Sequence, residues 1–329
     1  MRRLRLPALL LLLATAIAAG SVFWDPFPTS EQRFDRRANG IWLGHKWYTG
    51  YGVRNGKPVP GGELAQLKQN LDRHGIRDLF IHVGPALSDG TVRDKPGELF
   101  SSLRAVFSEA RLFAWVGARV ENIPLDDPVF QSELIASLAE LRAIGFDGVH
   151  FDFEPMIDYE PGYLTLLANV RTAMGLDFVI SQATPRANFM GIFPGPLRRS
   201  FWTADFYIAT MTASDQTVLM AYDSGLNYIN PYLAFVRHQT NLLVDWACSV
   251  PGHEVLIGLP AYEDVPLYSN PKVENLRTAS LGVRAALENR SPSSHCFSGV
   301  AIYSNWVTDQ EEWSDFRRYW MHPDGDSSQ

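Results

Sequence analysis

The sequence is short of basic residues, and this shortage excludes two classes of protein. Its 329 residues include 29 lysines and arginines against 36 acidic residues, which leaves a net charge of −7. No basic stripe is therefore available to neutralise phosphates, and we expect no nucleic-acid partner. No glycine-rich phosphate loop follows any of the apolar runs, which counts against a nucleotide-binding fold.

Metal ligands at useful spacings are also missing from the sequence. No close spacing of the kind that zinc sites use occurs among His45, His82, His238 and His253. We therefore expect no metal and no other cofactor.

Cysteine is nearly absent, with only Cys248 and Cys296 in the whole chain. In an exported protein an even count favours one disulfide. The alternative is two buried thiols that pack as small hydrophobic groups. The distance between the two residues cannot be derived from the sequence, so both interpretations stay open, with the disulfide favoured.

The chain has one long apolar run, at its N-terminus. A basic start, Met1–Arg5, precedes an apolar stretch from Ala8 to Ala19. Near the end of that stretch, Ala16-Ile17-Ala18 offers small residues at the positions that a signal peptidase needs. This pattern is typical of a secretory signal peptide, and the run is short for a membrane span of about 20 residues. We predict a signal peptide at residues 1–18 and export to the periplasm or the exterior. The alternative is an uncleaved anchor that tethers the protein to the membrane.

Apolar runs of strand length alternate with amphipathic stretches of helix length through the rest of the chain. The predicted strands are Gly40–Leu43, Asp78–Val83, Leu112–Val116, Gly148–Phe153, Phe178–Ala183, Val218–Ala221, Val255–Leu259 and Gly299–Tyr303. The predicted helices lie near 62–74, 97–109, 128–144, 160–174, 200–213, 229–248, 272–288 and 309–320. Eight such units predict an α/β fold, a single (β/α)₈ or TIM barrel over 40–322. A lead-in at 19–39 precedes it, and a flexible tail at 323–329 follows.

The fourth predicted strand has two different faces. His150, Asp152 and Glu154 occupy alternate positions, and the positions between them are apolar. A strand places alternate side chains on opposite faces, so the two acids point the same way at its C-terminal end. Buried acids need a partner or a use. In a barrel the active site lies at this end of the strands, so the pattern indicates chemistry there.

The ends of the other predicted strands bring further aromatic and polar residues to the same face. Aromatic faces stack on sugar rings, and carboxylic acids cleave glycosidic bonds. The candidates for this cleft are Trp42, Trp115, Gln182, Arg186, Tyr222, Asp223, Tyr262 and Trp306.

The segment Asp147–Glu154 resembles the strand-four motif of glycoside hydrolase family 18, the chitinases and endo-N-acetylglucosaminidases. That motif is Asp-Gly-x-Asp-x-Asp-x-Glu, and here only its middle acid differs, being replaced by His150. Met220–Asp223 is similar to the family's Met-x-Tyr-Asp in strand six. Trp306 lies where the family has its strand-eight tryptophan, the floor of the sugar subsite.

The resemblance implies a retaining, substrate-assisted glycosidase acting on β-linked glycans that contain N-acetylglucosamine. Glu154 would be the general acid and base, and the substrate's own 2-acetamido carbonyl would attack the anomeric carbon. Asp152 would accept a hydrogen bond from the acetamido N–H, while Tyr222 and Asp223 would hold the same group. The sugar would also contact Trp306, Trp42, Trp115, Gln182, Arg186 and Tyr262. We expect a monomer whose partner is this carbohydrate.

Two residues of the strand-four motif, His150 and Asp147, are expected not to contact the sugar. For the acid role the pKa of Glu154 must be raised, which a nearby anion and an apolar wall favour. A neutral His150 could hydrogen-bond Asp152 and orient it, whereas a protonated His150 would pair with Asp152 and lower the pKa of Glu154. We interpret Asp147 as structural, ordering the entry to the strand.

Two other functions remain open. A barrel glycosidase of another family could use Glu154 with a second carboxylate, Asp223 or Glu263, as nucleophile or base. A non-catalytic, chitinase-like protein could bind sugar without cleaving it, and His150 is the residue that raises this alternative. The fold alone does not choose among the three, since barrels carry many chemistries.

Overall fold

The computed structural model describes residues 26–188, 201–263, 269–288, 290 and 296–322. The predicted signal peptide at 1–18 and the predicted tail at 323–329 lie outside these residues, and the lead-in is described from residue 26 onwards. Within the described residues no helix is both long and apolar enough to span a membrane.

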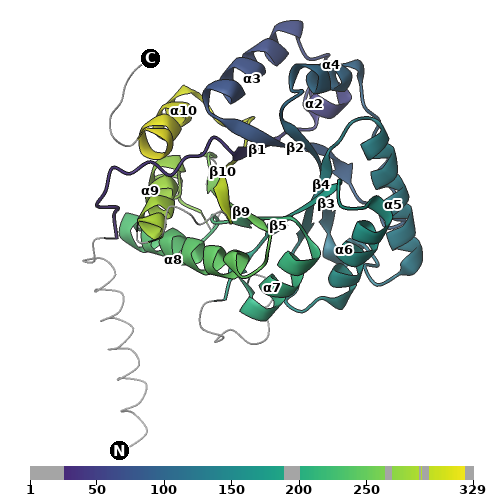
Figure 1. Cartoon of the computed structure of the whole chain (residues 1–329). Coiled ribbons are helices and arrows are strands. Elements are labelled where there is room, and N and C mark those ends of the chain that lie inside the picture. Colours follow the sequence, from purple (N-terminus) through teal and green to yellow (C-terminus); the bar gives the residue numbers. More distant parts are fainter. Residues whose placement is uncertain (1–25, 189–200, 264–268, 289, 291–295, 323–329) are drawn as a thin grey trace, which may run out of the picture.

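The centre of the fold is a closed barrel of eight parallel strands, which confirms the predicted (β/α)₈ architecture (Figure 1). The strands follow one another around the barrel in the order of the chain, and the last pairs with the first. They are β1 Asn39–Leu43, β2 Ile76–Pro85, β3 Arg111–Arg119, β4 Gly148–Glu154, β5 Val179–Thr184, β8 Gln216–Met220, β9 Glu254–Pro260 and β10 Phe297–Tyr303.

Helices surround the barrel and connect its strands (Figure 1). They are α2 Lys46–Thr49, α3 Gly61–Arg73, α4 Glu98–Val106, α5 Pro128–Ala143, α6 Pro161–Met174, α7 Ala204–Ala213, α8 Ile229–Cys248, α9 Leu276–Leu287 and α10 Gln310–Phe316. Their starts have ordinary physical causes. Asp127 caps α5, with proline in the first turn, and Asp309 forms a capping box on α10.

The structure departs from the predicted elements in small ways. The stretch predicted as a helix from residue 272 begins only at Leu276, because the side chain of Asn275 caps the backbone N–H of Thr278. A two-stranded ladder of Arg186–Ala187 (β6) and Phe201–Trp202 (β7) was not predicted, since two-residue strands carry no measurable periodicity.

An ionic cluster closes the N-terminal end of the barrel. Asp78, at the start of β2, is fully buried and receives hydrogen bonds from Arg77, Arg111 and Gln216. Burial alone would raise the pKa of Asp78, but the two arginines hold it below its usual value. Glu254, at the start of β9, pairs with the same arginines. Among the described residues these side chains therefore seal the barrel interior at this end.

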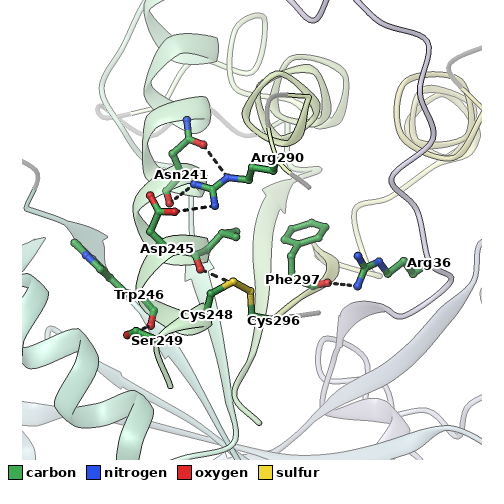
Figure 2. Close-up of a disulfide and its surroundings, with 10 residues drawn as sticks. Arg36, Asn241, Asp245, Trp246, Cys248, Ser249, Arg290, Cys296 and Phe297 are labelled. Atoms are coloured by element: carbon green, nitrogen blue, oxygen red, sulfur yellow. Dashed lines mark hydrogen bonds and ion pairs between the residues drawn. A yellow bond between two sulfur atoms is a disulfide. The ribbon is translucent and has the colours of Figure 1, made fainter. Parts of the chain in front are cut away.

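The two cysteines form a disulfide, as favoured from the sequence (Figure 2). Cys248 ends α8, and Cys296 lies just before β10, 48 positions further along the chain. Arg290 bridges the same region to α8 through Asn241 and Asp245. The bond thus ties the end of α8 to the start of β10, and a disulfide that closes a loop of this length typically stabilises a fold by about 2–4 kcal/mol.

Candidate active site

A cavity of about 260 Å³ opens at the C-terminal ends of the strands. Seven of the side chains that line it carry the chemistry of the site: Trp42, Asp152, Glu154, Arg186, Tyr222, Asp223 and Tyr303. They come from β1, β4, β6, the end of β8 and β10, so parallel pairing has brought together residues far apart in the sequence. The cavity thus opens at the end of the barrel that the sequence pattern indicated.

Glu154 is the last residue of β4 and lines the cavity at its mouth. Solvent reaches the Glu154 side chain there, although protein atoms surround most of its carboxyl group. Its pKa is raised to about 7, first by burial, then by the nearby charges of Asp152 and Asp223, while Arg119 lowers it. A carboxyl with such a pKa carries a proton near neutral pH. Glu154 can therefore act as a general acid.

Asp152 lies two residues deeper on the same face of β4. Its Oδ2 accepts a 2.9 Å hydrogen bond from the indole Nε1 of Trp115, while its Oδ1 is buried and finds no donor among the described residues. Burial raises the pKa of Asp152 to about 6, against the opposing effect of Trp115. A buried carboxylate oxygen without a donor is costly. This oxygen, in the wall of a cavity, is suited to a donor supplied by a ligand.

One carboxylate, Asp223, and a set of phenols lie across the cavity from β4. Tyr222 and Tyr303 stack with ring centroids 5.4 Å apart, and Tyr262 meets both rings edge-on. The Tyr262 hydroxyl donates a 2.6 Å hydrogen bond to Oδ1 of Asp223. Burial raises the pKa of Tyr222 well above its usual value, so this phenol stays protonated and can donate to a ligand.

Asp223 is held in a conformation that few non-glycine residues adopt, with φ at +53°. Arg186 donates a 2.9 Å hydrogen bond to its backbone oxygen, and the next residue, Ser224, is bound through its N–H and hydroxyl to the buried Glu274. Strain of this kind persists only where surrounding contacts enforce it. Here those contacts place the Asp223 carboxylate at the cavity wall.

Four of the predicted sugar contacts lie outside the cavity lining: Trp115, Trp306, Gln182 and Tyr262. Tyr262 acts through its hydrogen bond to Asp223. Trp115 acts through Asp152, as described above. Trp306 is 48% exposed, and its ring lies parallel to that of Trp115 with the centroids 6.3 Å apart. Trp306 therefore lies on the surface and does not form the floor of the cavity. Gln182 is fully buried on the outer face of β5, where it bonds Tyr163 and Thr217. The alternation of β5 gives the inner face to its neighbour Ala183, which does line the cavity.

Of the seven side chains that carry the chemistry of the cavity, Tyr303 is the one that was not predicted from the sequence. It ends β10 and contacts Trp42, Tyr222 and Trp306 through its ring. The position was available as a signal, because the last residue of a barrel strand faces the functional end. The resemblance to the family motif had instead pointed to Trp306, three residues later in the chain.

His150 does not contact Asp152, although the sequence had suggested a contact between them. Its two ring nitrogens are taken by the indole of Trp42, 3.2 Å away, and by the hydroxyl of Ser181, 2.8 Å away. Burial lowers the pKa of His150 to about 3, so the ring is neutral, and neither of the two contacts considered for it, a hydrogen bond or an ion pair with Asp152, forms. Asp147 is structural, as interpreted: its carboxylate binds Arg104 and the backbone N–H of Leu112.

Glu263, the alternative second carboxylate, is exposed and is not among the lining residues, whereas Asp223 is. In the described part of the chain, no group of three or more histidine, cysteine, aspartate or glutamate side chains is arranged to hold a metal ion. The chemistry available in the cavity is therefore that of paired carboxyl groups, phenols and indoles.

Comparison with known proteins finds likeness in structure and not in sequence. No protein-family model and no curated protein sequence matches the chain. The fold is similar to that of a family 18 chitinase from Chromobacterium violaceum, with 14% identity over 85% of this chain and 83% of that one and a TM-score of 0.56. It is similar to the spore cortex-lytic enzyme SleL of Bacillus cereus, with 13% identity over 86% and 74% and a TM-score of 0.58.

A third similar structure is the family 18 chitinase ChiB of Flavobacterium johnsoniae, with 13% identity over 88% of this chain and 94% of that one and a TM-score of 0.53. At such low identity these similarities establish the barrel and not the activity. They agree with the resemblance of the strand-four motif, which points to the same family.

Proposed function

We propose that this protein is a glycoside hydrolase that cleaves β-linked glycans containing N-acetylglucosamine, with retention and with the substrate's acetamido group as nucleophile. One observation carries the proposal: Glu154, with a pKa near 7, shares a cavity with Asp152, whose buried Oδ1 lacks a donor. An acetamido N–H is a donor that fits such an oxygen, and a protonated carboxyl is what the leaving oxygen needs.

In the proposed reaction Glu154 donates its proton to the glycosidic oxygen while the acetamido carbonyl attacks the anomeric carbon. The positive charge that develops on the oxazolinium ion is stabilised by the Asp152 carboxylate, which also accepts the N–H hydrogen bond. Tyr222 donates to the acetamido oxygen. Glu154, now ionised, takes a proton from water as the water opens the oxazolinium ion, which restores the starting state of the enzyme.

The placement of Asp223 supports this mechanism over one with an enzyme nucleophile. One oxygen of its carboxylate already accepts the hydroxyl of Tyr262 at 2.6 Å, which suits a positioning group better than an attacking one. Glu263, the other candidate, is exposed outside the cavity lining. The structural similarity to chitinases supports the same class of substrate, with chitin-like polymers, peptidoglycan and N-glycan cores as the candidate glycans.

We also propose export from the cytoplasm and action as a monomer on carbohydrate, without a nucleic-acid partner. The N-terminal pattern of basic and then apolar residues supports export. The Cys248–Cys296 disulfide supports an oxidising compartment. Membrane tethering through a retained N-terminal segment is the alternative, and N-terminal sequencing of the native protein distinguishes the two.

The test compares turnover of aryl N-acetylglucosaminides and chito-oligosaccharides with turnover of matched glucosides that lack the 2-acetamido group. We expect cleavage only of the acetamido sugars, with the β-anomer released first in NMR spectra of the products. Glu154→Gln should lose on the order of 10²–10⁴-fold in kcat. Glu263→Gln is the matched control, because it removes an exposed acid of the same type, and it should keep full activity.

Other results would support the competing functions. Cleavage of glucosides that lack the acetamido group, abolished in Asp223→Asn or Glu263→Gln, favours a direct nucleophile. Oligosaccharide binding without turnover, equal in wild type and Glu154→Gln, favours a non-catalytic binding protein. Either outcome contradicts the proposed mechanism.

A further inference from the structure

A chain of hydrogen bonds runs through the barrel interior, from the sealed end to the cavity. It joins five side chains that are all buried: Asp78, Gln216, Ser181, His150 and Trp42. The distances are 2.7 Å from Gln216 to Asp78, 2.7 Å from Ser181 to Gln216, 2.8 Å between Ser181 and His150, and 3.2 Å from Trp42 to His150. The residues come from β2, β8, β5, β4 and β1, so only barrel closure creates this path.

The chemistry of its two ends gives this chain one direction. An indole N–H can only donate, so Nε2 of His150 must be the acceptor and the ring proton must sit on Nδ1. Nδ1 then donates to Ser181, whose hydroxyl donates to the Gln216 carbonyl. The Gln216 amide donates to Asp78, an acceptor only, which Arg111 and Arg77 keep ionised. The opposite tautomer of His150 would leave the Trp42 indole N–H without an acceptor.

Trp42 is the member of the chain that reaches the cavity. It is nearly fully buried, lines the cavity and meets Tyr303 edge-on at 5.5 Å. Phe80 stacks on His150 at 4.1 Å and packs against Trp42 at 5.2 Å. The indole is thus held as the floor of the cavity by packing and by one hydrogen bond.

We propose that His150 is a positioning residue: as an Nδ1–H imidazole anchored on Asp78, it holds the Trp42 indole as the floor on which the reacting sugar lies. The kinetic consequence rests on the proposed function, whereas the positioning itself does not. A buried acid at this position would be an acceptor for the same indole but would add a negative charge near Asp152. The imidazole provides the acceptor without the charge.

The test uses two variants that split the two bonds of the imidazole. The amide of Gln reaches the position of Nε2, so His150→Gln keeps an acceptor for Trp42. The amide of Asn reaches only the position of Nδ1, so His150→Asn keeps the bond to Ser181 and loses the one to Trp42. Both remove the ring that stacks on Phe80, and Asn is smaller than Gln by one methylene; combining His150→Asn with Trp42→Phe separates that packing difference from the loss of the hydrogen bond.

We expect His150→Gln to retain kcat within a few-fold and His150→Asn to lose roughly 10²-fold in kcat, with a much smaller change in KM, because a misplaced floor affects the reacting geometry. Trp42→Phe combined with His150→Asn should lose no more than the more impaired of the two single variants, since both changes remove one bond. Equal kcat values in the Gln and Asn variants would overturn the proposal.

A second readout does not depend on turnover. In ¹⁵N NMR of histidine-labelled protein at neutral pH, the signals absent from His150→Gln should show a protonated Nδ1 and an unprotonated Nε2. The Trp42 indole proton, assigned with Trp42→Phe, should exchange with solvent at least about tenfold faster in His150→Asn than in wild type. A cationic ring or an Nε2–H tautomer overturns the proposal even in an active enzyme. Confirmed NMR results without any wild-type turnover instead contradict the proposed function and leave the positioning intact.

Discussion

Replacing Asp152 with asparagine removes a charge that acts on both the reacting sugar and Glu154. Burial raises the pKa of Glu154 most, and the Asp152 charge is the next cause. Without that charge the pKa of Glu154 should fall from about 7 by about one unit and stay above its usual value, because burial remains. The rate should also fall on the order of 10²–10³-fold, since the developing oxazolinium loses its counter-ion.

The sign of the pH effect follows from the protonation states that the mechanism needs. Glu154 works as an acid, so kcat/KM declines as pH rises through its pKa, and a lower pKa moves that decline to lower pH. Asp152 must be ionised, and its pKa is raised to about 6, so the wild type should have a narrow optimum between the two values. Asp152→Asn should lose the acidic limb of this profile as well.

The assay is kcat/KM from about pH 4 to about pH 9 on an aryl N-acetylglucosaminide. Asp147→Asn is the matched control, because it changes the same residue type at the entry of the same strand, where the carboxylate binds Arg104 and not the cavity. It should alter stability and leave the pH profile unchanged. An unmoved basic limb in Asp152→Asn would refute the assignment of that limb to Glu154 under the influence of Asp152.

Three other contacts, at Tyr262, Asp78 and His150, lead to measurable effects on activity or stability. Tyr262→Phe removes the hydrogen bond that orients Asp223 and should lower kcat roughly tenfold on acetamido sugars, as expected for a charge-assisted bond; an unchanged kcat contradicts the positioning role of Asp223. Asp78→Asn leaves Arg111 without its buried partner and should lower the free energy of unfolding by roughly 3–5 kcal/mol in urea denaturation, whereas a loss below about 1 kcal/mol would show that Glu254 compensates. Burial lowers the pKa of His150 to about 3, so below about pH 6.5 the unfolded chain binds a proton that the folded chain refuses. The free energy of unfolding should therefore decrease as the pH is lowered, by roughly 2–3 kcal/mol from this residue between about pH 6.5 and about pH 4.5. His150→Gln should show a weaker dependence of this free energy on pH, and an equal dependence in the two proteins would contradict the burial of a neutral His150.

The positions of the barrel strands and of the acids on β4 could be predicted from the sequence because they depend on local periodicity. All eight strands are confirmed, with ends that differ by a few residues. The alternation in β4 correctly placed Asp152 and Glu154 on the inner face at the open end. The same rule, applied to β5, would have assigned Gln182 to the outer face; the mistake there was to choose a residue by its type rather than by its position.

Partnerships across the barrel depended on closure, which no local pattern encodes. The sequence alone determined that an imidazole lies below two acids on one strand face. The tertiary structure decided that this imidazole meets Trp42 of β1 and Ser181 of β5 instead of Asp152, and that Tyr303 rather than Trp306 lines the cavity. Neighbours along a strand are fixed by covalent geometry, whereas contacts between strands are fixed by the stagger and tilt with which the sheet closes.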